Sequence, residues 1–117
     1  MGSKPKRILF VCTANMDRSP TAETLLKNFR EFEVKSAGIW PNARRRLTRE
    51  MIEWADVIFV MEDHHKDAVL TLNNSAEDKV IVLNIPDIYV RNDPKLVSIL
   101  KAKLTEYLGI NWDKSFL

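Results

Sequence analysis

Residues 7–20, with the sequence RILFVCTANMDRSP, decide the fold of this chain. The first six of them form a continuous apolar, β-branched run, which is typical of a strand buried on both faces of a parallel sheet. Ser19 and Pro20 then supply a helix cap and a residue suited to the first helical position. A buried strand that leads through a short loop into a helix predicts the first half of a βαβ unit.

The rest of the chain continues this alternation of strands and helices. Helical spacing and capping residues predict helices over residues 19–32, 48–55, 62–72 and 94–108. Short apolar runs predict further strands over residues 33–37, 56–61 and 79–83. Strands that alternate with helices imply right-handed crossovers. The sequence therefore predicts an α/β fold with three layers, α/β/α, around a four-stranded parallel sheet.

Length and composition narrow the class of protein. The chain has 117 residues, one cysteine and a formal net charge of +2, and it contains neither a repeat nor a linker, so we expect a single domain over residues 1–117. One cysteine excludes an internal disulfide and a zinc site of several cysteines. The apolar runs are far shorter than the roughly 20 residues of a membrane helix. Since no signal peptide is recognisable, we expect a cytoplasmic protein without a membrane partner, and the small excess of positive charge gives no reason to expect nucleic acid binding.

The loop after the first strand collects side chains that suit an anion. Open parallel sheets bind ligands beyond the carboxyl ends of their strands, and Cys12 stands at that edge. Arg18 follows six residues later at the start of the helix, where free N–H groups attract negative charge. A guanidinium fork can hold two oxygens of a phosphate at once. The loop therefore predicts a site for a tetrahedral dianion with an activated thiolate at its centre.

This loop resembles the signature loop of the low-molecular-weight protein tyrosine phosphatases, in which Cys, five cradle residues, Arg, Ser and Pro follow the first strand. The resemblance continues in order along the chain, in residues 36–38 (SAG), 45–48 (RRLT), 60–63 (VMED) and 85–89 (IPDIY). It implies the fold of that family and a cysteine-dependent phosphomonoesterase that needs no metal and no cofactor. The implied partner is a phosphorylated protein or a small phosphomonoester, with phosphotyrosine preferred, and the implied state is a monomer or a weak dimer.

The resemblance also implies a role for each catalytic residue. Cys12 is the nucleophile that forms a phosphocysteine intermediate, and Arg18 holds the equatorial oxygens of the phosphoryl group. Ser19 donates a hydrogen bond that stabilises the thiolate. Asp87 is the general acid that protonates the leaving oxygen and then the base that activates water. Asp93 lies in the same loop, but its position before a proline is more typical of a helix cap.

Further residues are implied to bind substrate or to support the loop. The cradle and the pocket wall are implied to consist of Thr13, Ala14, Asn15, Met16, Asp17 and Tyr89. Asn15 also keeps the loop in a strained conformation, because asparagine tolerates a positive φ angle. Ser36 and Asn42 are implied to support it, with Asn42 in the place where relatives carry a histidine.

Two departures from the family pattern bear on function. Asp17 stands where the family loop usually carries a second cysteine, so an oxidised Cys12 would need an external thiol for rescue. The Asp17 carboxylate must also point away from a bound phosphate. The chain is short for the family, and the missing segment is expected between Gly38 and Arg44, where part of the substrate wall would be. Two alternative functions remain open at this point, a non-catalytic phosphate-binding or phosphoprotein-binding module and a phosphocysteine carrier of the sugar phosphotransferase type.

Overall fold

The computed structural model describes residues 4–113, and its strands form one parallel sheet in the order β2-β1-β3-β4. The strands are β1 (Lys6–Cys12), β2 (Phe32–Gly38), β3 (Val57–Val60) and β4 (Val80–Val82). The predicted α/β architecture with a four-stranded parallel sheet is therefore confirmed. β1 lies inside the sheet, between β2 and β3, which explains why residues 8–12 are all apolar and buried.

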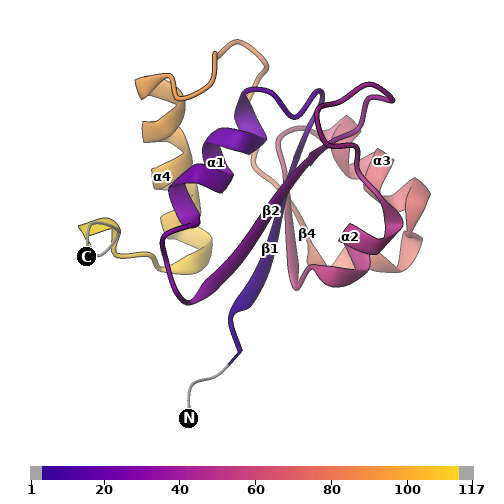
Figure 1. The fold of residues 1–117 in the computed structure, drawn as a ribbon, viewed down its shortest axis with the longest axis horizontal. Helices are drawn as coiled ribbons and strands as arrows, with labels where there is room; N and C mark the ends of the chain where they lie inside the picture. The colour runs from indigo at the N-terminus through magenta and orange to yellow at the C-terminus, as the bar shows by residue number, and fades with distance from the viewer. Residues whose placement is uncertain (1–3, 114–117) are drawn as a thin grey trace.

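Two helices cover each face of the sheet. The helices are α1 (Arg18–Leu26), α2 (Arg49–Trp54), α3 (Asp63–Leu72) and α4 (Pro94–Leu108), with a short 3₁₀ helix η1 (Asn74–Lys79) before β4. Figure 1 shows α1 and α4 on one side and α2 and α3 on the other. Alternate residues of β1 enter the two cores: Ile8 and Phe10 pack on the α1/α4 side, and Leu9 and Val11 on the other. The strand thus contributes to both layers with a period of two.

The first helix is shorter than the sequence predicts. It ends at Leu26 instead of continuing to residue 32, and the Phe29 amide closes a turn on the Leu26 carbonyl. Phe32 already belongs to β2, where it pairs with Lys6. The chain has to reverse before this pairing, so the tertiary structure overrides the helical spacing of Phe29. The 3₁₀ helix η1 was also not predicted.

Ser19 does not cap α1, because that helix already begins at Arg18 and its N-cap residue is Asp17. The ends of α2 and α4 follow their predicted capping residues. The Thr48 hydroxyl accepts a hydrogen bond from the Met51 amide at 3.2 Å, as expected for the first residue before α2. The Asp93 carboxylate accepts from the Lys95 amide at 2.8 Å at the start of α4. Gly109 ends α4 with φ of 63°, a left-handed conformation that glycine adopts without strain.

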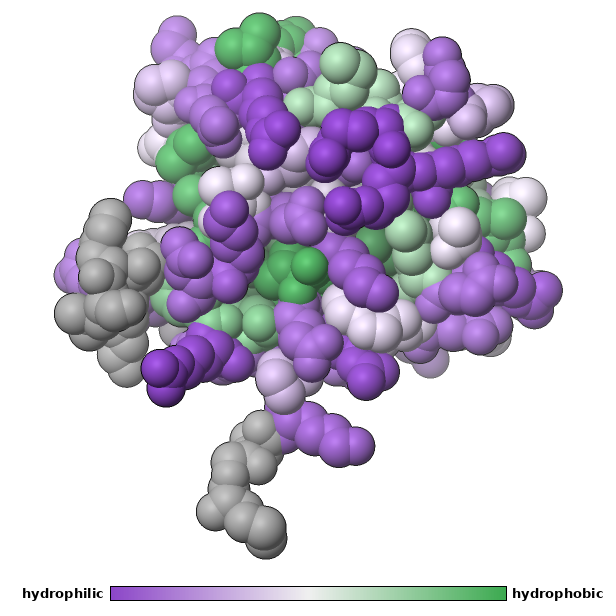
Figure 2. Space-filling model, in the orientation of Figure 1, coloured by the Kyte–Doolittle hydropathy of each residue, from purple (hydrophilic) through white to green (hydrophobic). Residues whose placement is uncertain are grey.

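The surface is mostly hydrophilic in the view of Figure 2, and its hydrophobic residues form small separate areas. One such area lies at the top of the view, where Figure 1 places the loop between β4 and α4. Ile88 and Val90 of that loop are largely exposed. Among the helices of residues 4–113, none is long and apolar enough to cross a membrane.

Candidate active site

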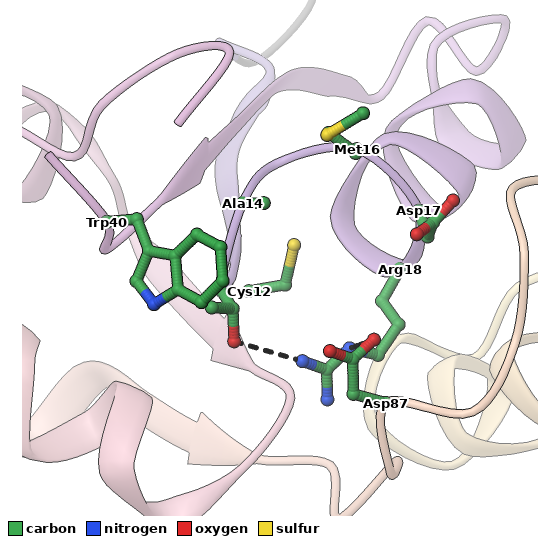
Figure 3. A pocket seen from close by; sticks show the side chains of 8 residues that line it. Cys12, Ala14, Met16, Asp17, Arg18, Trp40 and Asp87 are labelled. Atoms are coloured by element: carbon green, nitrogen blue, oxygen red, sulfur yellow. Dashed lines mark hydrogen bonds and ion pairs between the residues drawn. The ribbon is translucent and has the colours of Figure 1, made fainter. Parts of the chain in front are cut away.

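Cys12 ends β1 and lies at the floor of a small cleft. Its side chain is almost fully buried, and its Sγ lies 3.0 Å from the Ser19 Oγ in the first turn of α1. Figure 3 shows the sulfur pointing into the space between Met16, Trp40 and Asp87. A hydroxyl and a helix N-terminus beside a sulfur both stabilise its thiolate form, which is the nucleophilic form.

Asn15 orients that hydroxyl toward the sulfur. Its φ angle is 56°, the left-handed conformation expected for it, and its Nδ2 donates to the hydroxyls of Ser19 and Ser36, each at 2.9 Å. Because Ser19 accepts from Asn15, its own proton can be donated to Cys12 at 3.0 Å or to the Ala37 carbonyl at 3.5 Å, and the shorter contact favours the sulfur. The buried Oδ1 of Asn15 has no hydrogen-bond partner among the described residues.

Glu23, rather than Asn42, completes the support of Asn15. The Ser36 hydroxyl accepts from Asn15 and donates to Glu23 Oε1 at 2.5 Å, and Arg45 lies 3.5 Å from the other carboxylate oxygen. The prediction for Asn42 is wrong, because its side chain is exposed and bonds to none of the described residues. The sequence offered no signal for Glu23, which lies on α1 and not on the expected loop.

The loop between β1 and α1 presents free amides. None of the backbone N–H groups of residues 13–17 donates a hydrogen bond to another described residue. Buried amides are normally paired, so a run of free N–H groups beside a cleft points to an anion as the missing acceptor. These are the residues that the resemblance implied as the phosphate cradle, together with Arg18 at the end of the loop.

The segment after β2 holds this cradle in place from one side. The amides of Ile39, Trp40 and Arg44 donate to the carbonyls of Cys12, Thr13 and Ala14, in that order, at 3.0–3.1 Å. The Arg44 Nε also donates to the Asn15 carbonyl at 3.0 Å.

The close packing of this segment on the cradle requires glycine at position 38. A Cβ atom on Gly38 would lie 2.6 Å from the Thr13 carbonyl oxygen and 2.8 Å from the Asn15 nitrogen. The short segment thus supports the cradle directly.

Arg18 is fully buried beneath the cradle and has partners on several loops. Its Nη1 donates to Glu62 Oε2 at 2.5 Å and to the Ile85 carbonyl at 2.7 Å, and its Nη2 reaches the Thr13 hydroxyl at 3.3 Å. The hydrogen bond from Arg18 holds the pKa of Glu62 below its usual value, although burial opposes this effect. Glu62, the residue immediately before α3, therefore fixes the guanidinium that faces the cleft.

Asp87 lies on the opposite wall of the cleft from Trp40 (Figure 3). Its Oδ1 is 3.8 Å from Arg18 Nε, and its side chain is 60% exposed, so a substrate oxygen can reach it. Asp93 does not line the cleft, since its carboxylate caps α4. The geometry therefore favours Asp87 over Asp93 as the group that exchanges a proton with substrate.

Thr13 receives hydrogen bonds on both of its lone pairs. His65 Nδ1 accepts from the Glu62 amide at 2.9 Å, so in the neutral ring the proton is on Nε2, which lies 2.9 Å from Thr13 Oγ1. Burial of the ring, with lesser contributions from His64 and Arg18, lowers the pKa of His65 to about 3. His65 was not predicted for the site, because it lies on α3, 52 residues from Thr13.

The cleft itself encloses about 70 Å³ and is lined by Cys12, Thr13, Ala14, Met16, Asp17, Arg18, Trp40 and Asp87. Ligand pockets usually enclose several hundred Å³, so this one has room for a phosphoryl group while the rest of a substrate rests on the rim. Met16 and Trp40 on that rim are 60% and 52% exposed. Tyr89 was implied to wall the pocket, but it is not among the lining residues and packs, half-buried, against the α1/α4 core.

Two further features belong to the surroundings of the sulfur: Asp17, which is among the residues that line the cleft, and a cluster of possible metal ligands. The Asp17 carboxylate is turned away from the sulfur, and its Oδ1 accepts from the Arg91 amide at 2.9 Å. Glu62, His64 and His65 bring possible metal ligand atoms within 4.8 Å of one another. Both nitrogens of His65 and one oxygen of Glu62 already have protein partners, so we interpret this cluster as support for the cradle.

Known proteins that are similar to this chain include several phosphatases. Residues 7–55 match the family model described as low molecular weight phosphotyrosine protein phosphatase. The chain is 34% identical over 103 positions to a protein-arginine-phosphatase of Geobacillus stearothermophilus, covering 68% of this chain and 70% of that protein. It is 31% identical over 114 positions to the low molecular weight protein-tyrosine-phosphatase Ptp of Acinetobacter johnsonii, covering 72% and 80% respectively.

Solved structures of phosphatases have a similar fold. The tyrosine phosphatase AmsI of Erwinia amylovora superposes with a TM-score of 0.73 at 26% identity, covering 92% of this chain and 94% of that one. The cradle, its arginine and the cysteine beneath it lie in the part of the chain that the family model matches. This chain belongs to the low molecular weight phosphotyrosine protein phosphatase family.

Proposed function

We propose that the protein hydrolyses phosphotyrosine in proteins, with Cys12 as the nucleophile. The observation that carries this proposal is the placement of the Cys12 sulfur beneath free amides, beside Ser19 and across a phosphate-sized cleft from Asp87. Phosphoryl transfer needs positioning and charge stabilisation more than covalent help from many groups. The cleft supplies both with side chains and amides of this chain.

In the first step the Cys12 thiolate attacks phosphorus, and an S–P bond forms as the P–O bond to the leaving group breaks. The free amides and Arg18 stabilise the three equatorial oxygens of the phosphoryl group. Asp87 gives its proton to the leaving oxygen, which departs as a neutral alcohol or phenol.

In the second step water hydrolyses the phosphocysteine. The Asp87 carboxylate takes a proton from the water molecule as its oxygen attacks phosphorus, and the S–P bond breaks. The sulfur leaves as a thiolate that accepts the hydrogen bond from Ser19. Orthophosphate and the starting enzyme result, so the cycle balances without an added reductant or oxidant.

The rim supports an aromatic substrate. Trp40 and Met16 present exposed apolar surface above the sulfur, and a tyrosine ring that leaves the cleft would stack against the indole. Phosphoarginine is a second candidate substrate. The Geobacillus relative is a protein-arginine-phosphatase, and a guanidinium group can also stack on an indole face.

The decisive assay measures hydrolysis of p-nitrophenyl phosphate in the presence of EDTA, followed by competition among peptides with phosphotyrosine, phosphoserine or phosphoarginine and a mononucleotide. We expect turnover with EDTA and the highest kcat/KM for the phosphotyrosine peptide. Cys12→Ser should abolish turnover and retain vanadate binding. Turnover by this variant, or a requirement for a divalent ion, would overturn the cysteine mechanism.

The other outcomes separate the alternatives. A stoichiometric burst without turnover would favour a phosphocysteine carrier, and phosphate binding without a burst would favour a binding module. A preference for phosphoarginine would change the substrate but keep the mechanism. The single domain over residues 1–117 and the monomeric or weakly dimeric state stay predictions, and light scattering of the purified chain tests the second.

A further inference from the structure

Asp17 connects the phosphate cradle to the loop that carries Asp87. Its Oδ1 accepts a hydrogen bond of 2.9 Å from the Arg91 amide, although the two residues are 74 positions apart. Asp17 is the last cradle residue before α1, and Arg91 lies between β4 and α4. This single contact therefore links two of the loops that form the catalytic cleft.

Thr21 makes a second link to the same loop. Its hydroxyl donates to the Asp17 carbonyl at 2.7 Å, which leaves a lone pair that accepts from the Asn92 amide at 2.9 Å. Asn92 has a φ angle of 63°, a left-handed conformation that needs such local fixation. The amides of two successive loop residues are thus fixed to the first turn of α1.

The other end of this loop is also fixed. The Ile85 amide donates to the Met61 carbonyl at 2.9 Å, and the Ile85 carbonyl accepts from Arg18 at 2.7 Å. Between the two fixed ends Tyr89 packs, half-buried, against the α1/α4 core, whereas Ile88 and Val90 are 74% and 69% exposed. The position of Asp87 therefore depends on the packing of Tyr89 and on the hydrogen bonds at either end of the loop.

We propose that Asp17 is a positioning residue for the general acid. By holding the Arg91 amide, its carboxylate sets where the Asp87 carboxyl lies relative to the leaving oxygen. The proposal rests on the proposed function, since it assigns Asp17 a part in the proton transfer by Asp87. It also explains how an acidic residue is tolerated beside an anion site, because its charge is directed at a backbone N–H outside the cleft.

A competing effect of Asp17 is purely electrostatic. Its negative charge repels a phosphate dianion and the thiolate, so its removal would strengthen phosphate binding.

Two variants of Asp17 separate this electrostatic effect from the positioning of Asp87. Asp17→Asn keeps an oxygen that can accept from Arg91 and removes the charge, whereas Asp17→Ala removes both. Asp67→Ala is the matched control, since Asp67 is an exposed carboxylate on α3 away from the cleft lining.

The test compares two substrates that differ in their need for a general acid. Phenyl phosphate has a poor leaving group that needs the proton, and 2,4-dinitrophenyl phosphate has a stable phenolate that hardly needs it. The measured quantity is kcat/KM, which reports the step in which the leaving group departs. We expect Asp17→Ala to lower it about tenfold for phenyl phosphate, as for a modest misplacement of a catalytic group, and less than twofold for the dinitrophenyl ester. Asp67→Ala should stay within about twofold of the unmodified protein on both, whereas Asp17→Asn, which loses the charge and keeps the acceptor, should change kcat/KM for the two esters by the same factor.

Two more variants make the test independent of global folding. Thr21→Val keeps the shape of the side chain and loses the bond to Asn92, so it should show the same selective loss. In an Asp87→Ala background, Asp17→Ala should cause no further selective loss, because the acid to be positioned is gone. Equal losses on both esters, no loss for Asp17→Ala, or an undiminished effect without Asp87 would each overturn the proposal.

A failure of the proposed function is distinguishable from a failure of this inference. If the unmodified protein cleaves neither ester, the phosphatase assignment fails. If it cleaves both with the expected dependence on Asp87 but Asp17→Ala shows no selectivity, only the positioning role fails. Amide hydrogen exchange of Arg91 and Asn92 tests the link itself without substrate. Exchange at Arg91 should accelerate in Asp17→Ala but not in Asp17→Asn, and unchanged exchange in both variants would contradict it.

Discussion

The Nε2 atom of His65 and the Oγ1 atom of Thr13 lie 2.9 Å apart, so a neutral imidazole on α3 directs a hydroxyl of the phosphate cradle. Thr13 Oγ1 accepts a hydrogen bond from His65 Nε2 and a longer one from Arg18 Nη2, so both lone pairs of the Thr13 oxygen are used. Its own hydrogen is left to point into the cleft. Thr13 can therefore add a side-chain donor to the free amides that surround a bound phosphate.

Thr13→Val removes this donor and keeps the shape of the side chain. We expect inorganic phosphate and vanadate to inhibit the variant about tenfold more weakly, the change that corresponds to one hydrogen bond to a charged group. Thr13→Ser retains the hydroxyl and serves as the control, with inhibition within about twofold of the unmodified protein. Equal inhibition of the two variants would show that the Thr13 hydroxyl does not reach the phosphate.

The pH dependence of stability follows from the lowered pKa of His65. The unfolded chain binds a proton on His65 near pH 6.5, but the folded chain does so only near pH 3, so acidification favours the unfolded state across this window. The unfolding free energy should fall by up to about 1.4 kcal/mol per pH unit as the pH drops below 6.5. Glu62, whose folded pKa is also lowered, adds a loss of the same sign below pH 4.5.

Urea unfolding monitored by tryptophan fluorescence at pH 7.5, 6.0 and 5.0 measures this slope. His65→Gln keeps an amide that can donate to Thr13 and removes the titration, so its stability should change less with pH over this range. His64→Gln is the matched control: His64 is exposed and contributes less than burial to the lowered pKa of His65, so this variant should keep most of the slope. The same slope in the His65 and His64 variants would refute the assignment.

Gly38→Ala tests the close contact between β2 and the cradle. The added Cβ would lie 2.6–2.8 Å from backbone atoms of Thr13 and Asn15 and from the Ala43 side chain, and backbone atoms cannot move aside without displacing the cradle. We expect kcat/KM to fall by about 100-fold, the loss expected from a displacement near 1 Å. Gly109→Ala is the control: it has open space, and its positive φ predicts a loss of about 1 kcal/mol in stability with normal activity.

Asp87 and Asp93 should give opposite results when each is replaced by alanine. Asp87→Ala removes a largely exposed carboxylate at the cleft, so we expect kcat/KM for phenyl phosphate to fall about 100-fold at unchanged stability. Asp93→Ala removes the cap of α4, so we expect a loss of about 1 kcal/mol in unfolding free energy and nearly normal kcat/KM. If the activity loss follows Asp93 instead, the acid has been misassigned.

The sequence predicted the parts of the site that depend on local order. Cys12 at a strand end, Arg18 and Ser19 at a helix start, and the positive φ of Asn15 all belong to one continuous segment. The order of strands and helices followed in the same way from apolar spacing. Even there, the end of α1 was misjudged, because the turn at Phe29 depends on the pairing of β2 and not on helical spacing.

The residues that the sequence did not reveal act across long separations. Glu62 and His65 reach the cradle from α3 and its preceding loop, and Glu23 reaches Ser36 from α1. Each is an ordinary polar residue in its own segment, and only the packing of the sheet brings it to the site. Asn42 and Tyr89 do not line the cleft: Asn42 is exposed to solvent, and Tyr89 packs against the α1/α4 core.

The first turn of α1 is where these contacts converge. The Ser19 hydroxyl contacts the Cys12 sulfur, the Arg18 guanidinium donates to the Ile85 carbonyl, and Asp17 and Thr21 hold the loop of Asp87. Opening of this one turn would break all three sets of contacts at once while the sheet stayed intact. Heat inactivation should therefore precede melting of the sheet and reverse on cooling, and a bound oxyanion should raise the inactivation temperature more than the melting temperature.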